Sequence, residues 1–251
     1  MKILLTNDDG LDAPGLCALY DIALGLTDEA EIFTVAPAAE QSGMGHAISY
    51  KQTIQMERRG PNRWAVHGTP ADTVLLGIYN AMPTMPDLVL SGVNKGNNAA
   101  QNTLYSGTVG ASLEAALQGI PAIALSQFYG PQLADIDTFD AARAHGLQTI
   151  KTLLDADIWR HEDRPIHYNV NFPPCSGADV LGHEFTTQGF RRGAPFHSEA
   201  GADGYHIIGR PQHESTGAGS DVQANMNNQI AITPCGVDLT NQSTLSRLRQ
   251  L

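Results

Sequence analysis

The chain has 251 residues, 42% of them hydrophobic, and a formal net charge of −11 at pH 7. This length suits one α/β domain with an elaboration, and the hydrophobic share is ample for a packed core. The negative charge argues against nucleic-acid polymers and acidic membranes as partners, because both are polyanions. It does not exclude a small phosphorylated ligand, because a bound metal ion can reverse the local field.

The first half of the chain alternates strand and helix signals. Ile3, Leu4 and Leu5 form a short apolar run typical of a buried parallel strand, and Pro14 suits the first turn of a helix. The further expected elements are a strand at 31–35, a strand at 64–66, a helix at 70–82, a strand at 87–90, a helix at 108–120, a strand at 121–125 and a helix at 139–154. This rhythm predicts an α/β fold with a mostly parallel, doubly wound sheet and helices on both faces.

The pattern changes beyond residue 173. Helical periodicity fades, glycine, proline and polar residues dominate from 175 to about 219, and the segment 222–233 predicts a strand with polar interruptions. We expect a core over about 1–174 with an extended β-rich elaboration over about 175–240. The whole chain, 1–251, is then a single domain.

The expected compartment is the cytoplasm. Cys17, Cys175 and Cys235 lie far apart without CxxC spacing, which indicates ordinary buried or semi-buried thiols in a reducing environment. The N-terminus enters a strand directly, with no basic and apolar leader before it, and no apolar run approaches the length of a membrane span.

Two adjacent carboxylates, Asp8 and Asp9, follow the first strand directly. Open α/β folds place their ligand sites at the carboxyl edge of the sheet. Two carboxylates held close together raise each other's pKa unless a cation or a proton lies between them, and a hard divalent metal ion suits oxygen ligands. Taken alone, a plain Asx turn explains this segment equally well.

Three more polar clusters follow expected strands or precede an expected helix, at 36–45, 91–98 and 105–108. The first has glycines around a serine, the second supplies neutral oxygens, and the third opens a helix whose free N–H groups suit an anion. Taken singly, a surface loop, an Asn- and Gly-rich turn and N-capping by Ser106 or Thr108 explain them as well. Together with the two carboxylates, they suit hydrolysis of a phosphomonoester by metal-activated water.

At these residues the chain resembles the SurE survival proteins, metal-dependent 5′/3′-nucleotidases that act on nucleoside monophosphates. The motifs that carry the resemblance are 7–10, 13–15, 35–37, 41–43, 68–72, 91–94, 105–108, 169–173, 219–221, 233–234 and 237–240. The chain departs from the family pattern at Ala38, Ala39 and Glu40, where an Asp followed by basic or polar residues is usual. It also departs at Lys95 and Asn97, where a small residue and a proline are common, and Lys95 adds a cation beside the expected site.

The resemblance implies two sets of site residues. The metal ligands are Asp8, Asp9, Ser42 and Asn94, and the substrate-binding residues are Asn98, Ser106, Gly107 and Thr108. It also implies a Rossmann-like core, one divalent ion (Mg²⁺ or Mn²⁺), a nucleoside monophosphate as substrate, and a homodimer or homotetramer assembled through extended C-terminal β segments. Asp9 is our choice for the carboxylate that orients or deprotonates the attacking water, and its neighbour Asp8 stays open for that role.

Several other functions compete with this interpretation. A haloacid-dehalogenase-type phosphatase needs a second aspartate two positions after the first, where this chain has Gly10 after Asp8. A nicotinamide dehydrogenase needs a glycine fingerprint after the first strand, which the sequence lacks. A non-catalytic metal-nucleotide sensor, or a phosphatase of other phosphate esters or short polyphosphate, stays open.

Overall fold

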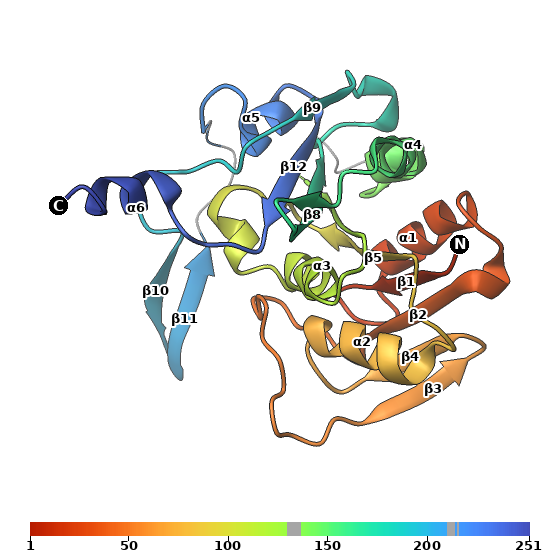
Figure 1. Ribbon diagram of the computed structural model, residues 1–251. Coiled ribbons are helices and arrows are strands. Elements are labelled where there is room, and N and C mark those ends of the chain that lie inside the picture. The colour runs from red at the N-terminus through yellow and green to blue at the C-terminus, as the bar shows by residue number, and fades with distance from the viewer. Residues whose placement is uncertain (130–136, 210–213, 215) are drawn as a thin grey trace.

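A computed structural model gives the fold of residues 1–129, 137–209, 214 and 216–251. The centre is a ten-stranded sheet with the order β3-β4-β2-β1-β5-β6-β8-β12-β9, and β7 pairs with β8 outside this path. Figure 1 shows helices α1 and α4 on one face of this sheet and α2 and α3 on the other. The mostly parallel, Rossmann-like α/β fold expected from the sequence is confirmed.

The strands are β1 (Ile3–Thr6), β2 (Ile32–Pro37), β3 (Met56–Gly60), β4 (Arg63–Val66), β5 (Leu88–Lys95), β6 (Ala122–Gln127), β7 (Arg160–His161), β8 (Arg164–Phe172), β9 (His183–Phe185), β10 (Phe196–Gly201), β11 (Gly204–Gly209) and β12 (Ile230–Gly236). The α-helices are α1 (Pro14–Leu24), α2 (Pro70–Leu76), α3 (Gly107–Leu117), α4 (Asp140–Ala156), α5 (Asp221–Met226) and α6 (Gln242–Leu248). The short 3-10 turns are η1 (Glu29–Glu31), η3 (Ala100–Leu104) and η5 (Gly177–Asp179), and the π-helical turn η2 (Gly77–Ala81) continues α2.

The central strands run parallel, and β1 lies between β2 and β5 with Ile3 opposite both Ile32 and Leu88. Every residue of β1 is buried, as expected for an apolar strand that has neighbours on both sides and helices on both faces. The chain passes from β1 to β2 on one side and later to β5 on the other, so β1 and β5 flank a topological switch point. Ligands of open α/β folds bind outside the carboxyl ends of the strands at such a point.

One apolar core lies on each face of the sheet. The face under α1 and α4 buries side chains such as Leu19, Ile22 and Ile150, and the face under α2 and α3 buries Val74 and Ala115. Each large side chain removed from water in this way contributes about 1.5–3 kcal/mol. These cores hold the strand ends, and therefore the site, in place.

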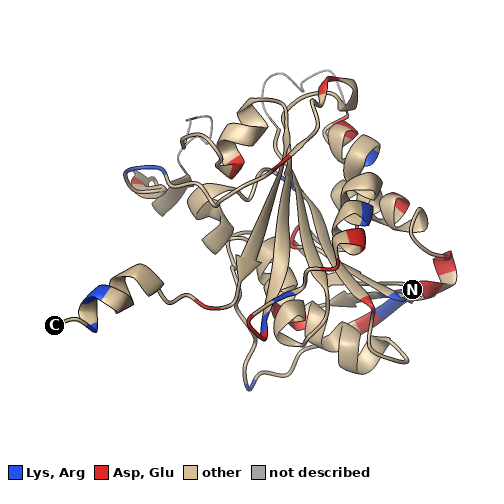
Figure 2. Ribbon diagram, turned by 45° about the horizontal axis from the view of Figure 1, so that its top comes forward, with Lys and Arg blue, Asp and Glu red and all other residues tan. Residues whose placement is uncertain are grey.

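The C-terminal part of the chain extends the central sheet. β12 pairs antiparallel with β8 and parallel with β9, whereas β10 and β11 form a separate hairpin. Figure 2 shows the last segment, with α6, reaching away from the body. None of the helices in the described residues is long and apolar enough to cross a membrane, and the cytoplasmic location stays a prediction.

The expected strand at 222–233 is wrong in its first half. Residues Asp221–Met226 form α5, and the strand begins only at Ile230. Ser220 caps the helix because its side chain accepts a hydrogen bond from the Gln223 N–H. The cysteines also differ in part from expectation, because Cys17 is exposed, although all three are free thiols.

Candidate active site at the carboxyl edge of the sheet

A pocket of about 1000 Å³ lies beside the carboxyl ends of β1 and β5. Six of the eight predicted site residues line it, namely Asp8, Asp9, Ser42, Asn94, Asn98 and Ser106. They come from four separate segments of the chain, and the first and last of these residues, Asp8 and Ser106, are 98 positions apart in the sequence. A second cavity, of about 800 Å³, lies between α1 and the start of β2, and no predicted site residue lines it.

Asp8 is buried against the first turn of α3. The Thr108 hydroxyl donates to Asp8 Oδ1, and a Cβ built on Gly107 would lie only 2.8 Å from the Asp8 Cβ, so this close approach requires glycine. Burial raises the pKa of the Asp8 carboxyl, while hydrogen bonds from Thr108 and from the backbone of Gly107 act in the opposite direction. Gly107 and Thr108, which we expected to bind substrate, thus contact Asp8. They are not among the residues that line the pocket.

Asp9 is partly exposed in the pocket. Its Oδ2 accepts a hydrogen bond from the Lys95 N–H at 3.3 Å. Burial, followed by the charge of Asp8 and then that of Glu40, raises the pKa of the Asp9 carboxyl to about 6. The Asx turn considered from the sequence also forms, because the Asn7 side chain bonds both the N–H and the carbonyl of Gly10. The turn and the carboxylate pair thus occur together, and the turn sets the direction of the chain at Asp8 and Asp9.

Ser42 lies on the loop that follows β2. Its hydroxyl donates to Glu40 Oε1 at 2.7 Å, and Gln41 N–H donates to the Asp8 carbonyl at 2.7 Å. A hydroxyl that donates its hydrogen to a carboxylate keeps its lone pairs for a cation. Ser42 is therefore compatible with the ligand role expected for it.

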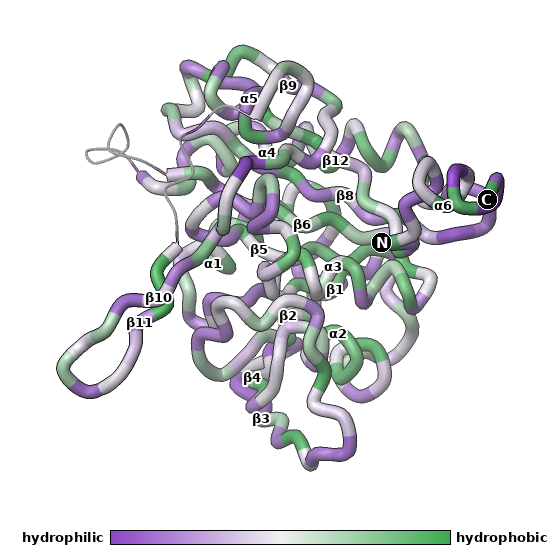
Figure 3. Tube along the Cα trace, turned by 90° about the vertical axis from the view of Figure 1, so that its left-hand side faces the viewer, coloured by the Kyte–Doolittle hydropathy of each residue, from purple (hydrophilic) through white to green (hydrophobic). Residues whose placement is uncertain are grey.

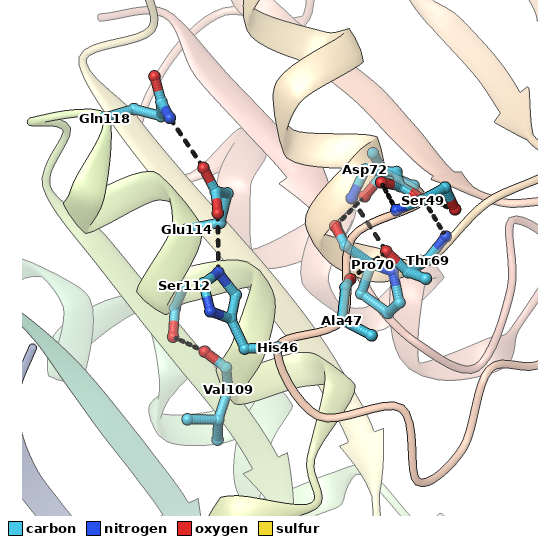
Figure 4. Close-up of polar contacts among 11 residues, drawn as sticks. His46, Ala47, Ser49, Thr69, Pro70, Asp72, Val109, Ser112, Glu114 and Gln118 are labelled. Atoms are coloured by element: carbon cyan, nitrogen blue, oxygen red, sulfur yellow. Dashed lines mark hydrogen bonds and ion pairs between the residues drawn. The ribbon is translucent and has the colours of Figure 1, made fainter. Parts of the chain in front are cut away.

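The distal part of this loop is fastened to the start of α2 and to the second half of α3 (Figure 4). His46 Nε2 lies 2.7 Å from Glu114 Oε2 on α3, and the Thr69 hydroxyl donates to the Ala47 carbonyl. The Ser49 N–H and hydroxyl both donate to the carboxylate of Asp72 on α2. These bonds hold the loop that carries Ser42 against rigid elements.

Asn94 is the penultimate residue of β5. Its side-chain nitrogen donates to the Gly96 carbonyl at 2.8 Å. The amide therefore turns its nitrogen to the backbone, and its oxygen, the atom that a metal ion needs, takes no hydrogen bond from the described residues. This geometry suits the ligand role expected for Asn94.

Asn98 is held from three sides. Its N–H donates to Asn171 Oδ1, its carbonyl accepts from Asn169 Nδ2, and its own Nδ2 donates to Ser126 Oγ, at 2.7–2.8 Å. Asn169 and Asn171 are buried in β8, and Ser126 is buried in β6. Sequence reasoning assigned these three residues no role, although alternating asparagines inside a buried strand are a signal that they have polar partners.

The donor set fits a hard divalent ion. Asp8 and Asp9 provide two carboxylates whose pKa values are both raised by burial, and Ser42 and Asn94 add neutral oxygens. Among the described residues, no three side chains of the types His, Cys, Asp and Glu gather as a metal-binding group. A metal ion in this pocket must therefore take part of its coordination from the neutral oxygens.

One wall of the pocket is apolar and aromatic. The rings of Tyr105 and Phe196 meet edge to face with centroids 4.8 Å apart, and Ile207 lines the pocket beside them. Tyr105 precedes α3, whereas Phe196 and Ile207 come from the β10–β11 hairpin, which Figure 3 shows extending from the body. Sequence analysis assigned none of these residues to the site, because the hairpin folds back from nearly 100 residues downstream.

Fold and pocket define the class as a Rossmann-like α/β protein with an oxygen-rich site at its switch point. The family model described as survival protein SurE matches residues 3–195, and the chain belongs to this family. It is similar to the 5′-nucleotidase SurE of Cereibacter sphaeroides, with 49% identity over 100% of this chain and 99% of the relative. The 5′-nucleotidase SurE of Roseobacter denitrificans is 48% identical over 99% and 98% of the two chains. The crystal structure of the SurE protein from Aquifex aeolicus matches with a TM-score of 0.82 and 31% identity, covering 100% of this chain and 99% of that one.

Proposed function

We propose that this chain is a divalent-metal-dependent phosphomonoesterase that hydrolyses nucleoside 5′-monophosphates, and also 3′-monophosphates, to nucleoside and phosphate. The observation that carries the proposal is the convergence of six expected site residues on one pocket at the switch point of the sheet. Family membership supports the same activity, since the relatives at 48–49% identity are 5′-nucleotidases. The chain is accordingly a 5′-nucleotidase, and its metal dependence and 3′ activity belong to the proposal.

Asp8, Asp9, Ser42 and Asn94 would hold one Mg²⁺ or Mn²⁺ ion. When bound, the ion supplies positive charge for the phosphate and lowers the pKa of water at the site. Thr108 and the start of α3 fix the Asp8 carboxylate, and Glu40 fixes the Ser42 hydroxyl. Such outer contacts orient ligands and strengthen them as donors.

Ser106 and Asn98 are the residues that would bind the phosphate. The Ser106 oxygen accepts from the Val109 N–H at 3.1 Å, which leaves its hydrogen for a phosphate oxygen. Asn98 donates one N–H to Ser126 and has a second on the same nitrogen. Gly107 and Thr108, also expected to bind substrate, would act on it through Asp8. The apolar wall of Tyr105, Phe196 and Ile207 suits the nucleoside.

Water is the proposed nucleophile, and Asp9 the carboxylate that orients or deprotonates it. Asp8 is the less suitable neighbour, because it is buried and engaged by Thr108, whereas Asp9 is partly exposed and, among the described residues, accepts a hydrogen bond only from the Lys95 N–H. No cysteine or histidine is among the lining residues of the described chain. Direct attack predicts inversion at a chiral phosphate ester, and net retention or a trapped phosphoaspartate would contradict it.

A turnover assay with controlled metal content tests the function. Purified protein should release phosphate from nucleoside monophosphates with added Mg²⁺ or Mn²⁺, lose this activity with a chelator, and regain it on adding metal back. A panel of 5′- and 3′-monophosphates, other phosphate esters and short polyphosphate ranks the substrates. Binding of nucleotide without any turnover would identify a sensor, and full activity in verified metal-free protein would refute the metal dependence.

We also propose that the chain forms a homodimer or homotetramer in the cytoplasm. Large apolar side chains are exposed on the β10–β11 hairpin, including Tyr205 and Ile207, and on the C-terminal segment, including Leu239 and Leu248. Exposed apolar groups that gather on projecting segments are typical of association surfaces. The free thiols of the three cysteines agree with a reducing compartment.

A further inference from the structure

Lys95 and Tyr129 form one rim of the pocket. This rim carries a positive charge, whereas the wall of Tyr105, Phe196 and Ile207 is uncharged. Lys95 ends β5, directly after Asn94, and Tyr129 follows β6, the neighbouring strand. The Lys95 ammonium lies over the Tyr129 ring, 5.3 Å from its centroid, and both residues line the pocket. A cation over an aromatic face is held by the ring's electrostatic field without losing its hydrogen-bond donors to a carboxylate.

Two basic side chains, Lys95 and Arg143, are among the lining residues in the described part of the chain, and of the two only Arg143 is paired with carboxylates. Arg143 is occupied, since its Nε donates to Asp137 and its Nη1 to Asp21. Within the part of the chain that the structure describes, the Lys95 ammonium forms no ion pair. This is notable because Asp9 and Glu40 line the same pocket. The three N–H donors of Lys95 are thus directed to a ring and to the open pocket instead of to a protein carboxylate.

The Lys95 side chain lies on the side of β5 that faces away from β1. Asn98 and Ser106, which would bind that phosphate, receive it beside Asp8 and Asp9, after β1 and β5. The Lys95 side chain lies over Tyr129, which follows β6, whereas Asp8 and Asp9 follow β1, on the other side of β5. A pocket of about 1000 Å³ is at the upper end for small-molecule sites, so it has room for a ligand that reaches both places.

We propose that Lys95, supported by Tyr129, binds a second phosphate group of the substrate, so that nucleotides carrying a second phosphate are favoured over monophosphates. The inference rests on the proposed function, because it concerns the substrate of that same site. Because Lys95 and the Asp8–Asp9 pair lie on opposite sides of β5, we take a phosphate across the ribose, as in a nucleoside 3′,5′-bisphosphate, as the expected ligand, and a 5′-diphosphate is the alternative that the test separates. Lysine acts on such a group as a point charge with three donors.

The test compares kcat/KM for adenosine 5′-monophosphate, adenosine 3′,5′-bisphosphate and adenosine 5′-diphosphate in the wild type and in Lys95→Met. We expect the variant to lose about tenfold on the bisphosphate and less than about twofold on the monophosphate, the size of one charge-assisted hydrogen bond. Lys95→Arg should keep most of the preference. Tyr129→Leu, which removes the ring under the ammonium, should lose part of it.

Arg143→Gln is the matched control, because it removes a cation from the same pocket that is already paired with carboxylates. It should leave the ratio of bisphosphate to monophosphate kcat/KM unchanged. A selective loss of kcat/KM on either doubly phosphorylated nucleotide in Lys95→Met supports the proposal. The nucleotide that shows the loss tells whether the second phosphate lies across the ribose or next to the first phosphate. An equal loss on all three substrates would place Lys95 on the reacting phosphate and overturn the proposal, as would no loss on any.

Failure of the proposed function is distinguishable from failure of this inference. If the wild type hydrolyses no monophosphate, the nucleotidase assignment fails. Titration calorimetry with the same nucleotides and Mg²⁺ is then free of turnover and still compares Lys95→Met with the wild type. A Kd for the bisphosphate that is unchanged by Lys95→Met would refute the second-phosphate site in that case as well.

Discussion

Ser106 serves structure and chemistry through different parts of one hydroxyl group. Its oxygen caps α3 by accepting from the Val109 N–H, and its hydrogen stays available to a ligand in the pocket. N-capping and phosphate binding, which compete as explanations of the sequence, are therefore compatible in the folded chain. The hydroxyl hydrogen of nearby Thr108 is instead used within the protein, because it is donated to Asp8.

Ser106→Ala should lower kcat/KM by on the order of 100-fold, since one donor to the developing charge of the transition state is removed. The affinity for the metal ion, measured by titration calorimetry, should change little, because Ser106 is not among the expected ligands. The lost cap should also reduce the free energy of unfolding by about 1 kcal/mol. Loss of metal binding with unchanged phosphate affinity would refute the role of Ser106.

The control for this variant is Ser220→Ala. Ser220 caps α5 in the same way, by accepting from the Gln223 N–H, and it lies outside the lining of the pocket. It should cost at least as much free energy of unfolding, because its hydroxyl also donates to the Gly217 carbonyl, while leaving kcat/KM close to the wild-type value. The pair separates the effect of a lost helix cap from the effect of a lost phosphate donor.

At the scale of elements, the loop after β2 depends on the helix α2. Asp72 forms a capping box with Thr69 at the start of α2, and the same carboxylate accepts two hydrogen bonds from Ser49 (Figure 4). One buried side chain thus stabilises the helix start and fastens the loop that carries Ser42. The position of a proposed metal ligand is coupled to the stability of a helix end some 30 residues later.

Asp72→Ala should reduce the free energy of unfolding by about 2–3 kcal/mol, because it removes the carboxylate half of the capping box and leaves the donors of Ser49 and the Thr69 N–H without their partner. Urea unfolding measures this loss, and limited proteolysis should show faster cleavage within 38–55. Ser49→Ala keeps the capping box and serves as the comparison, with an expected loss of about 1 kcal/mol. Equal losses in the two variants would contradict the double role of Asp72.

A second element-scale contact joins α3 to β8 through a buried histidine. The Ser112 hydroxyl donates to the Val109 carbonyl, so the Nδ1–H of His167 donates to the Ser112 oxygen, across 2.8 Å. Burial, followed by the charge of His46, lowers the pKa of His167 from 6.5 to about 4. The folded protein therefore holds His167 neutral, and protonation favours the unfolded chain.

The contribution of His167 to stability should be complete above about pH 6.5 and should decline as the pH falls toward about 4, by about 1.4 kcal/mol per pH unit. The sign follows because the unfolded chain binds the proton first. Urea unfolding between pH 7 and pH 4 should show a shallower decline in His167→Gln than in the wild type. His161→Gln, at an exposed position on β7, is the control and should keep the wild-type slope. An identical slope in His167→Gln would contradict the assignment.

At the scale of the whole molecule, the C-terminal segment lies away from the body that its own chain forms. Leu239 is 91% exposed, and Leu248 and Leu251 are also exposed beyond β12. Figure 2 shows this segment reaching outward from the sheet. The proposed oligomer would bury apolar side chains so placed against another copy of the chain.

Removal of residues 238–251 should lower the molar mass in light scattering from that of a dimer or tetramer to a smaller species. The reason is that the cut removes exposed apolar groups beyond β12 and leaves the central sheet intact. Ser243→Ala in the full chain, on the exposed helix α6, should keep the wild-type mass. An unchanged mass after truncation would show that association uses other surfaces.

Sequence alone determined the features of this protein that depend on local pattern. The apolar run Ile3–Leu5 predicts a buried strand, because its side chains on both faces of the sheet must be removed from water. The alternation of such runs with segments of helical spacing predicts the parallel α/β sheet. Carboxylates directly after that strand predict a site at the sheet edge. The same local reasoning failed at Val222, because a short helix with a capping serine and a strand with polar interruptions have similar patterns.

Only the tertiary structure decided which of these side chains meet. It turns Thr108 to Asp8 instead of into the pocket, supports Asn98 from Asn171, and lays Lys95 over Tyr129. Such contacts join residues 34 to 100 positions apart, and they depend on strand order and on the burial of whole faces. No pattern along the chain encodes that order residue by residue, because it results from the packing of all elements together.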